Sequence, residues 1–522
     1  MAASPSENKL SRLRAAMMRE LSFAADESFI EMLWALNALQ TGRAEYARDF
    51  FRVLPESAAT KGIHSPFAIY PWELETLANE LFTAPKSPVY RVFDCRGWPS
   101  IAHLVNLLRE IEDEESHTGR DDRNIWNELG RVSARQFEWQ RGFANVAELY
   151  RSALIYGKGA CAAYFNETHG ITISEMTLVG FVLMASFYTR PALLPTHDLR
   201  VVSELGISPA KLTVALSLLA KPLAEVARAA TELRQDAEQV AYKPSILRRF
   251  PCVLVGPRQK RMRAPLPDLI ASRVTSGLFY DVVGGGGEVR DDYGRRFESY
   301  TFQLCTSALP EMGFLGEWSY GSRGRSTFSP DVVGIDRPGA IEVVIECKAA
   351  KMSIAAKFGE DPSNARGYGD MAKGIAQIWR FFSHCRQGLT GRVALPDAKG
   401  LLVVLDDWFM LRGSVMQQVL QRAEVIADNM DDGILPEDRR PISFASISEL
   451  ERVLSTATPQ SFLAAVDLAS QEHRRGWMFS SIHQDVDLPK ATPRPYPFID
   501  RMDEVLPWWA FLQEFTDPEA AR

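Results

Sequence analysis

The chain has 522 residues, which is enough for about three domains. Hydrophobic residues make up 46% and charged residues 24%, a composition that is typical of a globular protein and excludes a disordered, collagen-like or coiled-coil chain. The formal net charge of −7 argues against a protein whose whole surface is basic and coats nucleic acid.

Several absent signals predict a cytoplasmic protein that has no membrane contact. The N-terminal segment is polar and no apolar run follows it, so no signal peptide is expected. The longest apolar stretch, 176–188, is shorter than the roughly 20 residues of a membrane span, and we expect a buried helix there. The six cysteines and eight histidines show no metal-ligand spacing, which predicts reduced core thiols and no zinc site.

Residues 1–242 are predicted to form a helical domain. Apolar residues recur at three- and four-residue spacing over 29–40, 100–114 and 211–234, while strand signals are almost absent. No repeat of fixed period is visible, so a regular solenoid is not expected.

Residues 243–290 are predicted to be a basic and glycine-rich connecting segment. Seven basic residues come before the first acidic residue, Asp268, and four consecutive glycines follow at 284–287. A phosphate-binding loop would need a GK[ST] ending or a GxGxxG before a helix, and neither is present. The glycine run is therefore interpreted as a flexible joint.

From residue 291 onward, helix and strand patterns alternate. The expected elements are a helix from 297, strands within 313–321, 328–335 and 340–350, a helix over 371–385, a strand over 400–409, helices over 415–429 and 446–456 and, between these two, a strand over 441–446. Residues 456–522 are predicted to be a helical and aromatic extension that packs back onto the body.

Two of these predicted strands carry residues of catalytic type. Asp331 follows Pro330 in the second strand, and Glu346 and Lys348 lie in the third. Residues i and i+2 of a strand point to the same face, so Glu346 and Lys348 project together while Cys347 points into the core. If the two strands are adjacent, Asp331 meets Glu346 across the ladder.

Two carboxylates beside one ammonium suit the metal-assisted hydrolysis of a phosphodiester. Mg²⁺ prefers oxygen ligands and often takes one or two carboxylates together with substrate phosphate and water. The metal activates a water molecule, and a lysine nearby can hold or deprotonate that water and stabilise developing charge. The alternative is a salt bridge between Glu346 and Lys348 at the end of a buried strand, without a metal.

The element order, together with Pro330-Asp331 and Glu346-Cys347-Lys348, resembles the PD-(D/E)XK, or restriction-endonuclease-like, nuclease superfamily over roughly residues 290–450. The resemblance implies a multidomain protein in which the mostly α-helical N-terminal region precedes an α/β nuclease domain, residues 291–455, with a central mixed sheet. It also implies that Asp331, Glu346 and the backbone carbonyl of Cys347 bind Mg²⁺, which Mn²⁺ can replace. Lys348 would assist the water.

Two further residues are implied by the same resemblance. Many members carry a glutamate on the preceding helix, which suggests Glu298, and some carry Q-x-x-x-Y on the following helix. This chain has Gln377 and then Phe381, so the hydroxyl of that motif is missing. Alternatively, Glu298 pairs with Arg295 or Arg296 at a helix start. Gln377 would then be a surface polar residue.

Four basic residues are candidates for contacts to DNA phosphates. Arg323 and Arg325 lie in a glycine-flanked segment between the first two strands, and Lys351 and Lys373 lie just past the third strand and on the following helix. All four could equally be solvated surface residues. Residues 243–358 hold 17 Lys and Arg against 12 Asp and Glu, so the acidic total does not exclude a nucleic-acid partner at one cleft.

These features predict a Mg²⁺-dependent deoxyribonuclease, an endonuclease, whose helical region is regulatory and senses a trigger or positions DNA. This domain organisation, a large helical region fused to a nuclease domain, is similar to that of bacterial restriction or phage-defence effectors. No helicase or NTPase motif is present, so a motor or sensor would be a separate partner, and a homo-oligomer is left open. One alternative is a nuclease-fold module that binds nucleic acid or a partner without cutting. Another is a helical scaffold with a fortuitous Glu-x-Lys.

Overall fold

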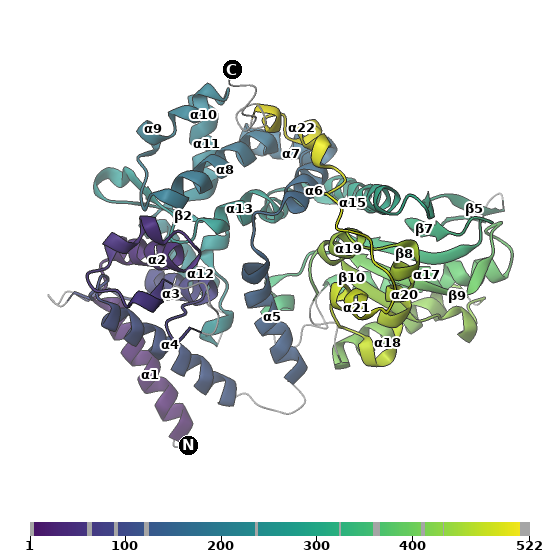
Figure 1. The fold of residues 1–522 in the computed structure, drawn as a ribbon, viewed down its shortest axis with the longest axis horizontal. Coiled ribbons are helices and arrows are strands. Elements are labelled where there is room, and N and C mark those ends of the chain that lie inside the picture. Colours follow the sequence, from purple (N-terminus) through teal and green to yellow (C-terminus); the bar gives the residue numbers. More distant parts are fainter. Residues whose placement is uncertain are drawn as a thin grey trace.

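The chain combines a helical N-terminal half with a mixed sheet in its C-terminal half, on the right of Figure 1. This computed structural model describes residues 5–59, 65–87, 92–118, 125–234, 239–322, 325–358, 366–408, 413–431 and 433–511. The protein is therefore of mixed α/β class, with helices as the main element.

The helices of the N-terminal half follow the predicted apolar pattern. They are α1 (Pro5–Ser22), α2 (Asp26–Gln40), α3 (Pro71–Thr83), α4 (Trp98–Thr118), α5 (Ile125–Arg141), α6 (Val146–Tyr156), α7 (Gly159–His169), α8 (Ile173–Thr189), α9 (Pro195–Asp198), α10 (Arg200–Glu204), α11 (Pro209–Leu219) and α12 (Leu223–Arg234). Local capping sets several boundaries: Thr172 and Glu175 form a capping box that starts the largely buried α8. The helices predicted over 29–40 and 100–114 are confirmed as parts of α2 and α4.

The helical pattern over 211–234 is interrupted in the structure. Helix α11 ends at Leu219, and a short strand, β1 (Ala220–Pro222), separates it from α12. Pro222 has no amide hydrogen and restricts the residue before it, so an uninterrupted helix through this point is unfavourable.

The segment after residue 243 packs into the helical half. Strand β2 (Cys252–Val255) pairs with β1 in parallel and with β3 (Arg261–Arg263) in antiparallel orientation. Helix α13 (Asp268–Val274) packs against α8, where Val274 lies so close to Gly180 that a side chain at this glycine would collide with it.

The glycine run at 284–287 is helical, which differs from the predicted flexible joint. A short helix, α14 (Phe279–Val282), and a 3-10 turn lead directly into α15 (Gly286–Ala308). A Cβ at Gly285 would lie 2.9 Å from Cγ of Tyr164 on α7, and Gly286 has a φ of +87°. The glycines thus permit a sharp helix start that packs closely on a neighbouring helix, which composition alone could not show.

The principal sheet has five strands in the order β10-β9-β8-β7-β4. Its strands are β4 (Gly313–Gly316), β7 (Val332–Ile335), β8 (Ile341–Lys348), β9 (Ala394–Val404) and β10 (Ile442–Ser446). Strand β8 is antiparallel to β7 and parallel to β9, and β9 is parallel to β10. The five strands of this sheet come in the predicted order, but hairpin strands at 319–322 and 325–328 and a short helix at 354–358, which were not predicted, lie between them.

Helices cover both faces of this sheet. Those in contact with the strands are α15, α17 (Arg366–Arg386), α19 (Ile447–Leu454) and α20 (Pro459–Ser470), while α18 (Gly413–Met430) packs on α17 and α16 (Ile354–Phe358) packs on α5. Val343, Ile345 and Cys347 of β8 belong to the core that contains the α15 side chains, whereas Val344 belongs to the core beneath α17. The alternation places Glu346 and Lys348 on the α17 face.

Two further structures complete the C-terminal half. Strands β5 (Ser319–Ser322) and β6 (Arg325–Phe328) form a separate hairpin that the sequence patterns did not resolve. Beyond α21 (Phe479–Asp485), the chain returns to the helical half, and α22 (Met502–Val505) lies there (Figure 1). There Phe498 stacks on Tyr150 and Trp508 donates to the carbonyl of Ser174.

All six cysteines are buried free thiols, as predicted. In the part of the chain that the structure describes, no single helix has the length and apolar character needed to cross a membrane. Within those described residues, the consecutive helices α7 and α8, which are bent by 70° relative to each other, meet that test as a pair.

Candidate active site

The start of β7 and the end of β8 bring two carboxylates together. Val332 pairs with Ile345, so Asp331 lies opposite Glu346 at the next position. The backbone amide of Cys347 donates to Oδ2 of Asp331 over 2.7 Å, which orients this carboxylate. The structure thus has the strand adjacency that the interpretation of these residues as a pair required.

Lys348 is hydrogen-bonded within the same group. Its Nζ donates to Oε1 of Glu346 over 2.6 Å and to Oε1 of Gln377 over 2.9 Å. Glu346 is 3% exposed, so the ion pair is largely shielded from water. Burial favours the neutral amine, but the carboxylates of Glu346 and Asp331 outweigh it and raise the pKa of Lys348. The ammonium is therefore protonated at neutral pH, and it can donate hydrogen bonds but not act as a base.

The surroundings of Asp331 disfavour the charged form of its carboxylate. Burial, and then the nearby carboxylates of Glu346 and Glu298, raise the pKa of Asp331 well above its ordinary value. Glu298, on α15, is affected in the same way: burial and Glu346 raise its pKa. Repulsion among these acids would be relieved by a cation.

The structure adds one acid that the sequence reasoning missed. Glu317 follows β4, and because Gly316 pairs with Val332, Glu317 lies opposite Asp331 at the next position. Desolvation and the charge of Glu346 raise the pKa of Glu317. Glu317 lies in the middle of the strand predicted within 313–321, and the sequence did not show that the strand ends at Gly316.

Helix α17 approaches the site through a glycine. A Cβ on Gly374 would lie 2.9 Å from Cε of Lys348 and 2.7 Å from Cδ1 of Leu402. The absence of a side chain therefore lets α17 lie close to β8, with Gln377 one turn further on and within reach of Lys348.

Phe381 does not belong to this group. It is 1% exposed, and its ring packs against Trp318 and Tyr320 at centroid distances of 5.7 and 5.8 Å. The departure from Q-x-x-x-Y thus places an apolar ring in the core.

A cavity of about 380 Å³ opens beside the ion pair. Glu298, Lys348 and Lys373 line it, and Lys373 is exposed. This cavity is where a phosphate group could reach Lys348.

For the other three residues predicted to contact phosphate, Arg323, Arg325 and Lys351, the described part of the structure shows no exposed side chain at this cavity. Arg323 lies outside the described residues, as does the side chain of Arg325, whose backbone belongs to β6. Lys351 makes an internal contact, since its Nζ donates to the carbonyl of Ser276 over 2.5 Å. Of the four candidates, Lys373 is therefore the one placed at the cavity with an exposed side chain.

The acids do not form a complete metal cage. Among the residues that the structure describes, no group of three or more His, Cys, Asp or Glu side chains is arranged to hold a metal ion. Glu298 therefore influences Asp331 and Glu346 by its charge without joining them as a third ligand. The donor set that remains is the two carboxylates with the carbonyl of Cys347. Such hard oxygens fit Mg²⁺, which commonly keeps several waters.

Comparisons of this chain with protein families, with curated proteins and with solved structures give no match.

Proposed function

We propose that this protein is a Mg²⁺-dependent deoxyribonuclease whose site lies at the adjoining ends of β7 and β8, in a restriction-endonuclease-like domain. The observation that carries the proposal is the group of Asp331, Glu346 and Lys348, which combines two opposed acids and an ammonium beside a cavity. The sequence predicts that Asp331 lies opposite Glu346 if their strands are adjacent, and β7 and β8 are paired in that register.

Each residue has a role that follows from its contacts. Lys348, protonated and held by Glu346 and Gln377, donates to a phosphate oxygen or orients the attacking water. Gln377 is a positioning residue, because it acts by fixing the ammonium. The Cys347 amide holds Asp331 with its carboxylate facing that of Glu346.

Asp331, Glu346 and the Cys347 carbonyl would hold the Mg²⁺. When bound, the ion supplies a Lewis acid that neutralises charge on the phosphodiester undergoing hydrolysis. The raised pKa of Asp331, caused by burial and by Glu346, supports this assignment because a cation would stabilise both carboxylates in their charged forms.

The surroundings of the site favour an anionic polymer as substrate. The cavity beside the site is lined by Arg290, Lys348, Lys351 and Lys373, and Lys373 stands exposed there. Local basic charge next to a cleft attracts phosphate backbones without coating the whole molecule.

The test is cleavage of plasmid, linear duplex, single-stranded DNA and RNA by the full chain, with Mg²⁺, with Mn²⁺ and with EDTA. We expect metal-dependent cutting of DNA that Asp331→Ala abolishes. Intact nucleic acid under every condition, with protein shown to be folded, would refute the proposal. Cutting that persists in Asp331→Ala would move the site elsewhere.

A second candidate function is binding of nucleic acid or a partner without cleavage. It is favoured by the direct bond between Lys348 and Glu346, which occupies a carboxylate that the metal would need, and by the absence of a third carboxylate ligand among the described side chains. DNA binding that is indifferent to divalent metal, with no cutting, would support this alternative.

The wider role proposed is that of an effector in restriction or phage defence, with the helical half regulating the nuclease half. The support is the fusion of a large helical region to the candidate site. Plating efficiency of phages on cells that express the wild-type chain or Asp331→Ala tests it, because protection should require the intact site.

A further inference from the structure

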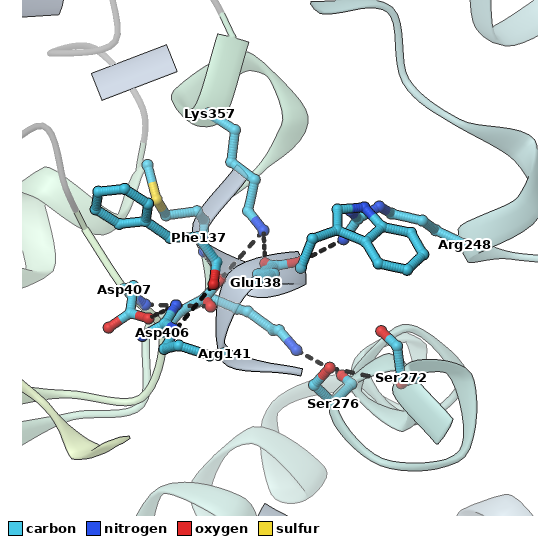
Figure 2. Close-up of polar contacts among 12 residues, drawn as sticks. Phe137, Glu138, Arg141, Arg248, Ser272, Ser276, Lys357, Asp406 and Asp407 are labelled. Atoms are coloured by element: carbon cyan, nitrogen blue, oxygen red, sulfur yellow. Dashed lines mark hydrogen bonds and ion pairs between the residues drawn. The ribbon is translucent and has the colours of Figure 1, made fainter. Parts of the chain in front are cut away.

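A charged junction joins the helical half to the sheet half. Figure 2 shows Glu138 of α5 between Arg248 and Lys357, and Arg141 of α5 beside Asp407. Nζ of Lys357 lies 3.1 Å from Oε1 of Glu138. A cavity of about 380 Å³, distinct from the one at the candidate active site, opens at this junction.

Lys351 is a cation of this junction that makes no ion pair with any described carboxylate, although Asp406 and Glu148 are near enough for their charges to act on it. Among the residues that the structure describes, no carboxylate lies within 4.0 Å of its Nζ, which instead donates to the Ser276 carbonyl and lies 5.8 Å from the ring centre of Phe279. Neighbouring cations are neutralised: Arg273 pairs with Asp281 at 2.6 Å, and Lys357 pairs with Glu138. A desolvated ammonium without a carboxylate is costly, so an anion beside it would be stabilising.

Two more residues with polar side chains, Ser245 and Arg249, line this cavity, and the Arg249 guanidinium lies 5.1 Å from the ring centre of Phe250. Oγ of Ser245 is buried, and it has no hydrogen-bond partner in the described part of the chain. Arg249 is exposed and, within the same part, has no carboxylate within 4.0 Å. Arg249 and Lys351 line the cavity together and supply two cations to one space, whereas Ser245 belongs to its lining with a hydroxyl oxygen that has almost no accessible surface.

The same cavity has aromatic walls. Trp72, Tyr280 and Phe358 contribute to its lining. Its volume falls within the roughly 300–1,000 Å³ of small-molecule sites, which combine apolar and aromatic walls with a few polar groups. Arginine, lysine and serine are common phosphate ligands, and aromatic walls suit a planar ring.

We propose that this junction cavity binds a nucleotide, with its phosphate at Lys351 and Arg249 and its base against the aromatic wall. Lys351 also lines the cavity of the candidate active site, three residues beyond Lys348. A nucleotide bound here would thus contact a residue that lies shortly after the end of β8, from the side of the helical half. The binding itself does not depend on whether the chain cuts DNA.

The experiment is calorimetric titration of the full chain, without divalent metal, with each of the four ribonucleoside 5′-monophosphates, with the matching nucleosides and with inorganic phosphate. We expect saturable binding of at least one monophosphate and at least tenfold weaker binding of its nucleoside. Lys351→Met should weaken the monophosphate at least tenfold, while Lys351→Arg should keep part of the affinity.

Lys373→Met is the matched control, because Lys373 lines only the candidate active-site cavity of the two. It should bind the nucleotide as the wild type does. Absence of binding by every monophosphate, or equal affinity in Lys351→Met, would overturn the proposal. Equal weakening by Lys373→Met would also overturn it, because the phosphate would then occupy the candidate active site. Unfolding midpoints of all variants show whether they are folded.

Discussion

At the scale of single residues, the site holds the carboxylates of Asp331, Glu346 and Glu298 beside the ammonium of Lys348. Lys348 neutralises Glu346 directly, whereas Asp331 is held by a backbone amide and faces two further acids. Catalytic sites often keep such unfavourable charge because the reaction needs it. The cost should therefore be measurable as a dependence of stability on pH.

The first prediction concerns Asp331 in metal-free protein. Its folded pKa is raised above the roughly 3.9 of an unfolded chain by burial and by Glu346. The folded state consequently holds the extra proton, and this stabilisation, complete below the unfolded pKa, is lost as pH rises through the folded pKa. Asp331→Asn should flatten the fall in unfolding midpoint as pH rises from about 4 to 8, and it should be more stable than the wild type at the upper end of this range.

The measurement is thermal unfolding across this pH range in EDTA and again in Mg²⁺. Mg²⁺ should raise the midpoint of the wild type more than that of Asp331→Asn. A wild type whose stability rises with pH in EDTA, by an amount that Asp331→Asn removes, would contradict the assigned direction.

A second residue-scale prediction concerns the Q-x-x-x-Y motif. Phe381→Tyr restores the motif in sequence but buries a hydroxyl among Trp318 and Tyr320. We expect a loss of about 1–3 kcal/mol in the free energy of unfolding and no gain in cleavage rate. Urea unfolding and plasmid cleavage measure the two effects. A faster enzyme of unchanged stability would show that the ring position belongs to the site.

At the scale of elements, the sequence predicts those helices and strands, and those side-chain directions, that depend on neighbouring residues in the chain. The apolar lead-in to Glu346 identifies β8, and the i, i+2 spacing correctly places Glu346 and Lys348 on one face. The glycine run was misinterpreted because its closeness to Tyr164, on a helix far away in the chain, leaves no local signal. The contact between Lys351 and Ser276 was missed for the same reason.

The third prediction tests how α17 lies on β8. Gly374→Ala introduces a Cβ within 2.9 Å of Cε of Lys348, and the flexible lysine should yield, which misplaces its ammonium. We expect cleavage to fall by about 10²-fold, as for other small misplacements at active sites. Stability should change little, since alanine favours the helix by about 1 kcal/mol and offsets the crowding.

Gly369→Ala is the matched control on the same helix, since nothing lies within 4 Å of its Cβ position. It should keep full activity and gain stability. Equal activity of the two variants, measured as single-turnover rates, would show that the close approach of α17 does not position Lys348.

At the scale of the whole molecule, buried charges join the two halves. Glu138 of α5 accepts from Arg248 in the helical half and from Lys357 in the sheet half (Figure 2). Burial disfavours its charged form, yet Lys357 and Arg248 prevail and hold the pKa of Glu138 far below its usual range. This contribution to stability is present above about pH 4.3 and is lost as pH falls through the folded pKa.

The fourth prediction follows from that junction. Glu138→Gln leaves two cations without their shared carboxylate, and it should cost toward the lower end of roughly 3–5 kcal/mol because 24% of the side chain is exposed. Glu424→Gln, at an exposed position on α18, should change stability by less than about 0.5 kcal/mol. Urea unfolding compares them, and equal losses would mean that Glu138 does not join the halves.

The central claim is that Lys348, Asp331 and Glu346 cut DNA, and two matched lysines that line one cavity test it most directly. The measurement is the single-turnover rate of plasmid cleavage in Mg²⁺ at saturating protein for the wild type, Lys348→Met and Lys373→Met. The account predicts a rate reduced at least about 10²-fold in Lys348→Met and nearly unchanged in Lys373→Met, whose DNA affinity alone should weaken. Undiminished cleavage by Lys348→Met, or none by the wild type, would contradict it.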